Sequence, residues 1–180
     1  RQPLLYKNDR TMNSGVDFKK QSVILLTNVI WDAQLHYPTN AFPGMIAWIL
    51  RTIEYFKTRP DLQLFIRVHP AEDSGIPKSR QSVIQEIQSR YKELPSNIFV
   101  IGSESAVSTY WLAEQCDVAL IYATKTGLEL AARGIPVIVA GEAWIRNKGI
   151  SHDASSEKEY LELLEKLPFG KRLNDSIRER

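Results

Sequence analysis

The segment from Asp117 to Gly141 (DVALIYATKTGLELAARGIPVIVAG) limits what this chain can fold into more than any other. Short apolar runs at 117–122 and 137–140 predict two buried strands. Between them, Thr126 stands three residues before Glu129, which is the spacing of a capping box and predicts that a helix begins at Thr126. A glycine and a proline then end this helix before the second strand. The segment therefore predicts one strand–helix–strand unit.

The turn at the start of this helix is polar. When a helix joins two parallel strands, its N-terminus lies beside the carboxyl end of the first strand, where backbone N–H groups and the helix dipole attract anions. Thr124, Lys125 and Thr126 add two hydroxyl groups and an ammonium group at this point. We therefore expect the turn to bind a phosphorylated ligand.

The rest of the chain also alternates between strand and helix patterns. Further strands are expected at 22–29, 62–68 and 97–101, and further helices at 43–57, 78–91, 107–115 and 157–167. This alternation predicts a single doubly wound, Rossmann-like α/β domain with a parallel sheet of about five strands and helices on both faces. We place the domain at residues 21–170, after a linker or arm at 1–20 and before a charged tail at 171–180.

The composition excludes several classes of protein. The 23 basic and 21 acidic residues give a net charge of +2, which is too balanced to indicate a nucleic-acid partner. Cys116 is the only cysteine, so we expect no disulfide framework and a reducing compartment. No apolar run approaches the roughly 20 residues that span a bilayer. We expect a cytoplasmic protein and, because the chain begins at Arg1 without a signal peptide, a domain of a longer one.

The sequence lacks the motifs of several common sites. It has no GxxxxGK[ST] phosphate loop, no GxGxxG dinucleotide fingerprint after the first strand and no GxSxG nucleophile elbow. It also has no HExxH motif or paired Cys/His cluster. We therefore expect no metal and no cofactor.

Polar residues follow each predicted strand. Ligands of open α/β sheets bind outside the carboxyl ends of the strands, at the point where the strand order switches, so these residues should share one edge of the sheet. The five groups are Thr27-Asn28, His69-Pro70, Ser103-Glu104-Ser105, Thr124-Lys125-Thr126 and Gly141-Glu142.

The second group contains the first candidate for chemistry. Pro70 keeps His69 extended, so its ring can face a ligand and donate to a phosphate oxygen, or instead satisfy a nearby loop carbonyl. Arg67 lies two residues earlier on the same face of the strand. A charge in a central strand must be paired or must reach the edge of the sheet, so Arg67 contacts the ligand or pairs with Glu72 or Asp73.

Other polar residues admit two roles each. Ser108 and Thr109 can cap a helix or contact phosphate, and Glu129 can complete its capping box or accept hydrogen bonds from a ribose diol. Trp144 lies in a basic loop that suits a sugar or a base, or packs against a partner domain; its basic and polar neighbours are Arg146, Asn147 and Lys148. Asp32 and His36 are weaker candidates for a base on the acceptor side.

Three motifs resemble those of capsule and surface polysaccharide biosynthesis glycosyltransferases. They are IRVHPAE at 66–72, SxxSTYxxAExCD at 105–117 and IYxTKTGLELAxxGIPVIVAGEAWIRNKG at 121–149. They resemble the carboxyl-terminal, nucleotide-sugar-binding half of these two-Rossmann-domain (GT-B) enzymes. Related His-Pro motifs occur in bacterial sialyltransferases, Kdo transferases and CDP-glycerol glycerophosphotransferases, which share a cytidine-phosphate donor.

The resemblance implies a donor site with a catalytic histidine. It implies that the donor phosphate meets His69 and four hydroxyl side chains, and that Glu129 meets the ribose. The hydroxyl side chains are those of Ser108, Thr109, Thr124 and Thr126. The full set of expected substrate-binding residues is Asn28, Arg67, Ser105, Ser108, Thr109, Thr124, Lys125, Thr126, Gly127, Glu129 and Trp144.

The resemblance also implies partners. They are a nucleotide-sugar donor, an amino-terminal acceptor domain of the same protein and, through the full-length enzyme, peripheral contact with the inner membrane. The catalytic base usually sits in the acceptor domain, so we expect this fragment to be inactive alone. Two alternatives remain open: a nucleotide-sugar epimerase domain, and a non-catalytic Rossmann-like module that binds a partner protein.

Overall fold

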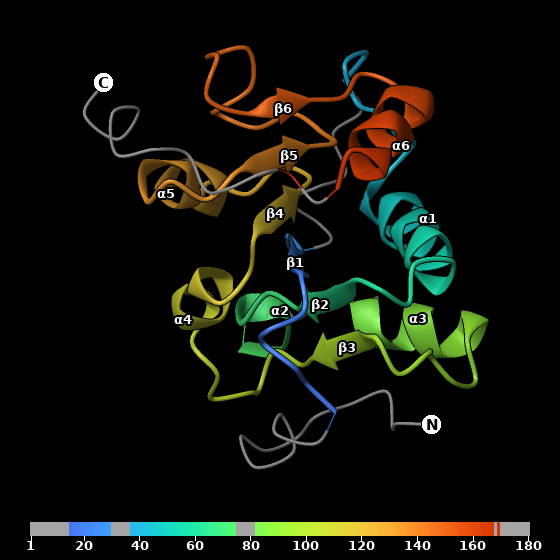
Figure 1. Ribbon diagram of the computed structural model, residues 1–180. Coiled ribbons are helices and arrows are strands. Elements are labelled where there is room, and N and C mark those ends of the chain that lie inside the picture. The colour runs from blue at the N-terminus through green and yellow to red at the C-terminus, as the bar shows by residue number, and fades with distance from the viewer. Residues whose placement is uncertain (1–14, 30–36, 75–81, 168, 170–180) are drawn as a thin grey trace.

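The computed structural model describes residues 15–29, 37–74, 82–167 and 169. Among these, six strands form one parallel sheet in the order β3-β2-β1-β4-β5-β6 (Figure 1). The strands are β1 Ser22–Leu26, β2 Gln63–Arg67, β3 Ile98–Ile101, β4 Val118–Ile121, β5 Val137–Val139 and β6 His152–Asp153. The predicted doubly wound α/β class is confirmed. The candidates Asp32 and His36 lie outside the described residues.

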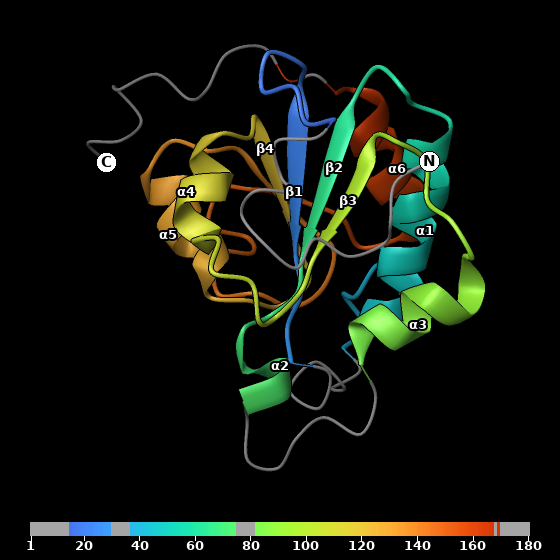
Figure 2. The ribbon, with the colours of Figure 1, turned by 90° about the horizontal axis from the view of Figure 1, so that it is seen from below.

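Helices cover both faces of the sheet. The helices of the described residues are α1 Met45–Lys57, α2 Ala71–Ser74, α3 Val83–Arg90, α4 Thr109–Glu114, α5 Thr126–Ala132 and α6 Glu157–Glu165. Helices α4 and α5 lie on one face, and α1, α3 and α6 lie on the other (Figure 2). Alternate strand residues supply the two cores, because successive side chains point to opposite faces. Phe65 thus packs on the α4/α5 side and Ile66 on the α1 side.

Two short elements were not predicted. Strand β6 has only two residues, His152 and Asp153, and lies at the edge of the sheet beside β5. Because neither residue is apolar, the sequence has no apolar run that would predict this strand. Helix α2 is a single turn that begins directly after Pro70. In addition, α1 begins at Met45 with Gly44 as its N-cap rather than at Pro43. The two additional elements and the later start of α1 leave the predicted layers unchanged.

The strand order switches at the junction of β1 with β4. Strand β1 pairs with β2 on one side and β4 on the other, and Leu26 lies opposite both Arg67 and Ile121. The residues that follow these three strands therefore begin at the same level of the sheet. This brings together the chain after Leu26, the chain that leads to His69 and the turn that contains Thr124.

The described end of the predicted arm contacts the domain. The Asp17 N–H donates to Gln63 Oε1 at 3.0 Å, and the Gln63 side-chain amide donates back to the Asp17 carbonyl at 2.8 Å. The ring of Phe18 stacks on Phe65 with centroids 6.1 Å apart. Residues 17 and 18 therefore extend the packing on the α4/α5 side.

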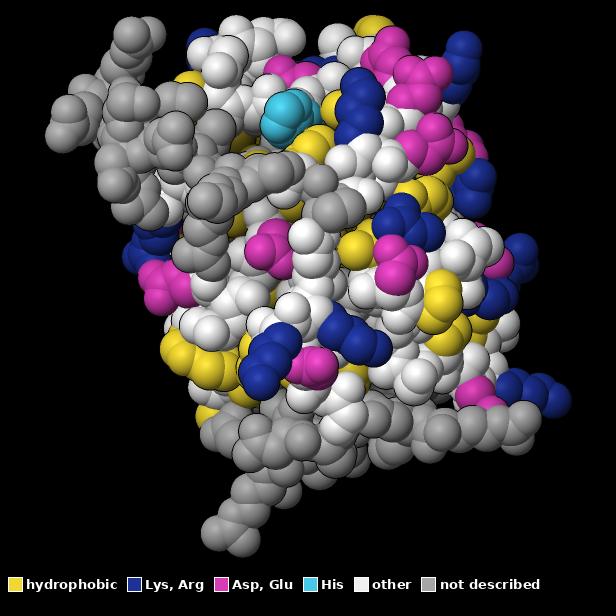
Figure 3. Space-filling model, in the orientation of Figure 1, with side chains coloured by type: hydrophobic (Ala, Val, Ile, Leu, Met, Phe, Trp, Pro, Cys, Tyr) yellow, Lys and Arg dark blue, Asp and Glu magenta, His cyan; other side chains and the backbone are white. Residues whose placement is uncertain are grey.

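The described surface is mixed in charge. On the face seen in Figure 3, Lys and Arg side chains are interspersed with Asp and Glu side chains. Within the described residues, no helix is both long enough and apolar enough to cross a membrane.

Candidate functional site

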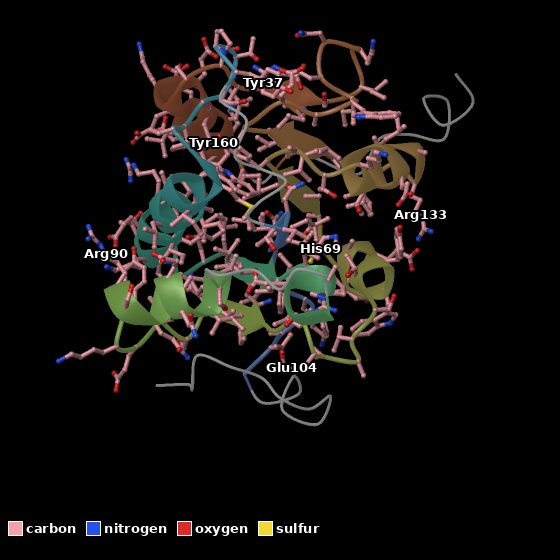
Figure 4. The ribbon with its side chains drawn as sticks, turned by 180° about the vertical axis from the view of Figure 1, so that it is seen from behind. Tyr37, His69, Arg90, Glu104, Arg133 and Tyr160 are labelled. Atoms are coloured by element: carbon pink, nitrogen blue, oxygen red, sulfur yellow. The ribbon has the colours of Figure 1, made fainter. Side chains whose placement is uncertain are left out.

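A cleft of ≈ 930 Å³ opens at the carboxyl ends of the strands. Half of the predicted site residues line it; these are Asn28, His69, Thr124, Lys125, Thr126 and Trp144. Figure 4 looks onto this edge of the sheet and shows His69 near the centre of the view, with Tyr37 and Glu104 on opposite sides. The cleft therefore occupies the switch point, where the topology predicts a ligand.

A smaller pocket of ≈ 210 Å³ adjoins the cleft on the α4 side. Three residues line both cavities, namely His69, Thr124 and Thr126. The other polar residues of the small pocket are Thr27, Arg67, Thr109 and Tyr110. His69 and the two threonines thus stand between a larger and a smaller compartment, and a ligand that occupies both must pass them.

Asn28 connects two sides of the cleft by hydrogen bonds. Its side-chain Oδ1 accepts a hydrogen bond from the Ala123 N–H at 3.2 Å, and its own N–H points at the sulfur of Met45 at 3.1 Å. The carboxamide thus holds the turn after β4 against the end of β1. The predicted cleft residue Asn28 therefore also builds the cleft wall.

The turn that precedes α5 differs from the predicted capping box. The N-cap is Lys125, in the helical region and without a side-chain cap bond, so Thr126 is the first helical residue and not the cap. The Thr124 hydroxyl accepts from the Thr126 N–H at 3.3 Å and donates to Thr126 Oγ1 at 3.2 Å. The capping-box prediction was wrong because Thr124, two residues before, covers that N–H group. Both hydroxyls still line the two cavities.

Glu129 makes a contact that local spacing does not reveal. Its Oε2 accepts a hydrogen bond from the phenol of Tyr110 on α4, rather than reaching back to an N-cap N–H. This bond, together with partial burial and the charge of Glu129, raises the pKa of Tyr110 above its usual value. Glu129 lines neither cavity, whereas Tyr110 lines the smaller one. Tyr110 is a site residue that the sequence interpretation missed.

Gly127 has a packing role. A side-chain carbon added there would collide with Cδ1 of Ile121 on β4. Its missing side chain therefore lets α5 lie close to β4. Gly127 is buried, and it lines neither cavity.

His69 is oriented by two backbone hydrogen bonds. Its N–H donates to Thr27 Oγ1 at 2.9 Å, which joins the ends of β2 and β1. Its ring Nδ1 accepts from the Ala71 N–H at 3.1 Å. Because Nδ1 acts as the acceptor, the neutral ring carries its proton on Nε2. The ring is thereby prepared to donate from Nε2.

Arg67 is a buried cation that binds backbone carbonyl groups. Its side chain is only 4% exposed, and it donates to the carbonyl oxygens of Gly102 and, at 3.3 Å, Ser105. Burial lowers the pKa of this guanidinium, and the nearby Glu104 opposes the shift. No ion pair joins this charge to a carboxylate among the described side chains, so the predicted pairing with Glu72 was wrong, while the side chain of Asp73 lies outside the described part of the structure.

Glu72 instead binds the start of α3. Its Oε1 accepts from the Ser82 hydroxyl at 3.0 Å and from the Val83 N–H at 3.1 Å. Arg67 holds the loop between β3 and α4 and is also one of the residues that line the smaller pocket.

The hydroxyl residues at the start of α4 have different roles. Ser105 Oγ accepts from the Val107 N–H at 3.3 Å within its own loop. Ser108 is the N-cap of α4, and its Oγ accepts from the Trp111 N–H at 3.4 Å, as the capping interpretation requires. Thr109, the next residue, lines the smaller pocket. Of this group, Thr109 is the one that faces a cavity.

Trp144 and Lys125 form one wall of the cleft. The Lys125 Nζ lies 4.6 Å from the centroid of the Trp144 ring, within the range of a cation–π contact. The Trp144 side chain is 68% exposed, which is unusual for a tryptophan and leaves its surface available to a planar ligand.

Arg146 fixes the loop that carries this tryptophan. It is only 5% exposed, although its position in a basic loop predicted an exposed side chain. Its guanidinium donates to the carbonyls of Gly141 and Ala154, both at 3.0 Å, and to Ser155 Oγ at 2.8 Å. The loop is therefore built around a buried cation that no local sequence pattern indicates.

The described residues contain no group of three or more His, Cys, Asp and Glu side chains that could hold a metal ion. Hydroxyl, imidazole, ammonium and guanidinium groups converge on the two cavities instead. All of these groups donate hydrogen bonds, and the ammonium and guanidinium groups also carry positive charge, so together they suit a phosphorylated ligand.

Comparison with known proteins identifies the family. Residues 6–171 match the family model described as "Capsule polysaccharide biosynthesis protein". The chain belongs to this family. None of the curated proteins with which it was compared matches it.

Solved structures share the fold at low sequence identity. UDP-GlcNAc 2-epimerase from Neisseria meningitidis, bound to UDP-GlcNAc, superposes with a TM-score of 0.56 at 15% identity, over 94% of this chain and 40% of the other. KpsC from Thermosulfurimonas dismutans, a β-Kdo 2,4 transferase, gives 0.55 at 14% identity, over 92% and 44%. MnaA from S. aureus, solved with UDP, gives 0.57 at 13% identity, over 96% and 41%. The chain thus spans less than half the length of these proteins.

Proposed function

We propose that this chain is the donor-binding half of a glycosyltransferase that moves a sugar from a nucleotide-activated donor to a surface polysaccharide acceptor. The observation that carries the proposal is the pair of adjoining cavities at the switch point, with His69, Thr124 and Thr126 between them. Membership of a capsule polysaccharide biosynthesis family supports it. Glycosyltransferase and nucleotide-sugar-binding proteins with the same fold are consistent with it.

In this proposal the large cleft holds the nucleoside and the sugar. Trp144 offers an aromatic surface to the base or the sugar, and Lys125 beside it offers a positive charge. The donor phosphate lies at His69, Thr124 and Thr126, where the two cavities meet. A cavity of ≈ 930 Å³ is within the size range of small-molecule sites.

The small pocket would take the charged end of the donor. Thr109 offers a hydroxyl there, and the buried guanidinium of Arg67 offers a positive charge that no carboxylate of the described residues neutralises at ion-pair distance. An anionic ligand would offset the cost of burying that charge. The His-Pro sequence at 69–70 favours a cytidine-type donor.

Catalysis in this proposal rests on stabilising the leaving group. As the bond between the anomeric carbon and the donor phosphate breaks, negative charge grows on the phosphate oxygen. His69, with its proton on Nε2, donates a hydrogen bond to that oxygen, and the Thr126 hydroxyl adds a neutral donor. The acceptor and the general base come from an amino-terminal domain of the full-length protein. The full-length protein acts in the cytoplasm, in peripheral contact with the inner membrane.

Nucleotide titration of the 180-residue chain tests the donor site. We expect calorimetry to detect CMP, CDP or another nucleotide with a dissociation constant of about 0.1–1 mM, because a site without its partner domain binds weakly. Thr126→Val removes one cleft hydroxyl at nearly constant shape and should cost about 0.5–1.5 kcal/mol of binding. Thr58→Val, at the far end of α1, is the matched control. Absence of heat with every pyrimidine and purine nucleotide at millimolar concentration would reject the donor-site proposal.

A nucleotide-sugar epimerase is the second candidate, favoured by the fold similarity to UDP-GlcNAc 2-epimerase. Incubation of the full-length protein with UDP-GlcNAc, followed by proton NMR, separates the two. A C2 epimer formed without an acceptor would replace the transferase proposal. Transfer of sugar to a saccharide acceptor would exclude the non-catalytic module.

A further inference from the structure

The large cleft contains a carboxylate that the proposed phosphate site does not use. Among the described residues, Glu142 is the one acidic residue that lines the cleft, and no acidic residue lines the smaller pocket. Its side chain is 41% exposed. The basic residues of the cleft are His69, Lys125, Arg146 and Lys148. Because a carboxylate repels phosphate, Glu142 suits a part of the ligand that carries no negative charge.

Two neighbours hold the Glu142 carboxylate by one of its oxygens. Thr39 donates its hydroxyl hydrogen to Oε2 at 2.7 Å, and Nε of the buried Arg146 lies 3.9 Å from the same oxygen. Both contacts use Oε2, which leaves Oε1 as an acceptor for a ligand. A side chain that is already held loses less rotamer freedom when a ligand binds, so the carboxylate is prepared for a contact.

The backbone around Glu142 is fixed as well. A side-chain carbon added at Gly141 would collide with the carbonyl oxygen of Tyr122, so the chain enters this turn in close contact with the end of β4. The Ala41 N–H donates to the Ala140 carbonyl at 2.8 Å, which joins the segment before α1 to the end of β5. The carboxylate therefore occupies a defined point on the cleft wall.

Glu142 and His69 follow strands that are well separated in the sheet. Strand β2 leads to His69, β5 leads to Glu142, and β1 and β4 lie between them (Figure 1). Three strand spacings amount to about 14 Å. A group that contacts Glu142 is therefore a different part of the donor from the phosphate at His69.

The chemistry of the Glu142 surroundings favours a sugar ring as that group. An ionised carboxylate accepts hydrogen bonds and donates none, so its ligand must carry hydrogen-bond donors. The hydroxyl groups of a sugar are such donors. The exposed ring of Trp144, two residues further along the chain, lines the same cleft and offers an apolar surface to the face of a sugar.

We infer that Glu142 is a specificity-determining residue whose carboxylate accepts a hydrogen bond, on Oε1, from a hydroxyl group of a sugar ring in the donor. The ring is either the ribose or the transferred sugar. The inference rests on the proposed donor-binding function and adds to it a residue that selects hydroxylated ligands. A deoxy analogue would leave the carboxylate without this bond and would bind more weakly.

Glu142→Ala tests the inference, because it removes the carboxylate. Thr39→Val is the matched control, since it breaks the bond between the two segments from its other end and leaves the carboxylate in place. Thr39 lines neither cavity. Glu114→Ala is a second control, which removes an exposed carboxylate that is paired with Arg133 at 2.7 Å away from both cavities.

NMR titration measures millimolar dissociation constants for the wild type and the three variants. The ligands are the nucleotide that binds most tightly, its 2′-deoxy and 3′-deoxy analogues, UDP and UDP-GlcNAc. Thermal denaturation shows whether each variant is folded. Glu142→Gln keeps an oxygen that accepts from Thr39, so it replaces the alanine variant if that variant unfolds, and it should lose affinity for the same ligands.

We expect Glu142→Ala to weaken binding by about tenfold or more, the lower end of the range for a hydrogen bond to a charged group. If the hydroxyl belongs to the ribose, the ribonucleotide shows this loss, and one of the deoxy analogues changes by less than about twofold. If it belongs to the transferred sugar, UDP-GlcNAc shows the loss and UDP changes by less than about twofold. Both control variants should change every ligand by less than about twofold.

Four results would overturn the inference while leaving the donor site intact. Equal losses for the nucleotide and both deoxy analogues, and for UDP and UDP-GlcNAc, would assign the effect to the base or to the shape of the cleft. An equal loss in Thr39→Val would assign it to the broken link between the two segments. Unchanged affinity would remove Glu142 from the ligand, and higher affinity would mean that the carboxylate repels the phosphate. Failure of the wild-type chain to bind any nucleotide is a separate outcome, which rejects the proposed function and the inference together.

Discussion

The ring of His69 accepts a hydrogen bond on Nδ1 from the backbone N–H of Ala71, two residues further along the chain. The acceptor lies in the connection between β2 and α2, and the donor is the first residue of α2. Helix α2, a four-residue helix that no sequence pattern predicted, therefore supplies the N–H group that bonds Nδ1. That bond fixes the tautomer of the histidine in the cleft. The proton on Nε2 is the group that the proposed donor site needs.

His69→Ala should weaken nucleotide binding by about 1.5–3 kcal/mol, the range for a hydrogen bond to a charged group. Thermal stability should change little, because the ring lies at the edge of the sheet. Calorimetry and thermal denaturation measure the two effects. His152→Ala, on β6 and away from both cavities, is the control and should leave affinity unchanged. A variant that binds normally but melts much earlier would assign His69 a structural role only.

Trp144→Ala should reduce nucleotide affinity by about 1–3 kcal/mol if a base stacks on the ring, by analogy with stacking in nucleic-acid sites. Trp111→Ala provides a matched control, since this tryptophan is also exposed (46%) and lines neither cavity. Quenching of tryptophan fluorescence on nucleotide addition should disappear only in Trp144→Ala. Equal quenching in both variants would remove the base from this wall of the cleft.

Arg146→Ala should destabilise the fold by about 2–4 kcal/mol, because two backbone carbonyls and a hydroxyl lose a buried charged donor. Arg146→Lys should restore little of this, since an ammonium cannot span the same three acceptors. Arg51→Ala removes an exposed ion pair with Glu157 and should cost less than about 1 kcal/mol. Urea unfolding compares all three, and similar losses in the Arg146 and Arg51 variants would contradict the structural role.

Stability should fall as the pH rises above about 10, the usual pKa of tyrosine. Burial raises the pKa of Tyr160, whose hydroxyl is joined to Thr52 by a 2.7 Å hydrogen bond. In the unfolded chain this phenol ionises near its ordinary pKa, whereas in the folded protein it stays protonated, so proton release favours unfolding as the pH rises. Tyr160→Phe should therefore lose less stability between pH 9 and 11 than the wild type, as measured by urea unfolding. Parallel pH profiles for the two proteins would show that another group controls the loss.

Most of the sheet could be predicted, because its buried strands are continuous apolar runs. The runs at 22–26 and 118–121 lie within predicted strands, and both pair as parallel neighbours. Strand β6 was missed because it is short and carries a histidine and an aspartate. An apolar pattern indicates strands that are buried in a core. It does not indicate a two-residue strand that only adds to the edge of the sheet.

The candidate site was harder to predict, because its contacts join residues distant in sequence. Glu129 has the local spacing of a capping residue, but its partner is Tyr110 on another helix. Arg67 and Arg146 carry charges that sequence patterns assign to the surface or to a ligand, yet both are buried and bind backbone carbonyls. The cavity-lining hydroxyls were predictable because parallel topology alone brings the ends of the strands together.

The pairing of β1 with β4 has a consequence for how the protein folds. These neighbours are far apart along the chain, and the Ser22 N–H donates to Asp117 Oδ2 across a separation of 95 residues. Closing so long a loop costs entropy before any contact repays it, so such pairings tend to form slowly. The walls of the cleft come from both sides of this junction. During synthesis, we therefore expect the candidate site to assemble only after the ribosome has released the chain well beyond β4.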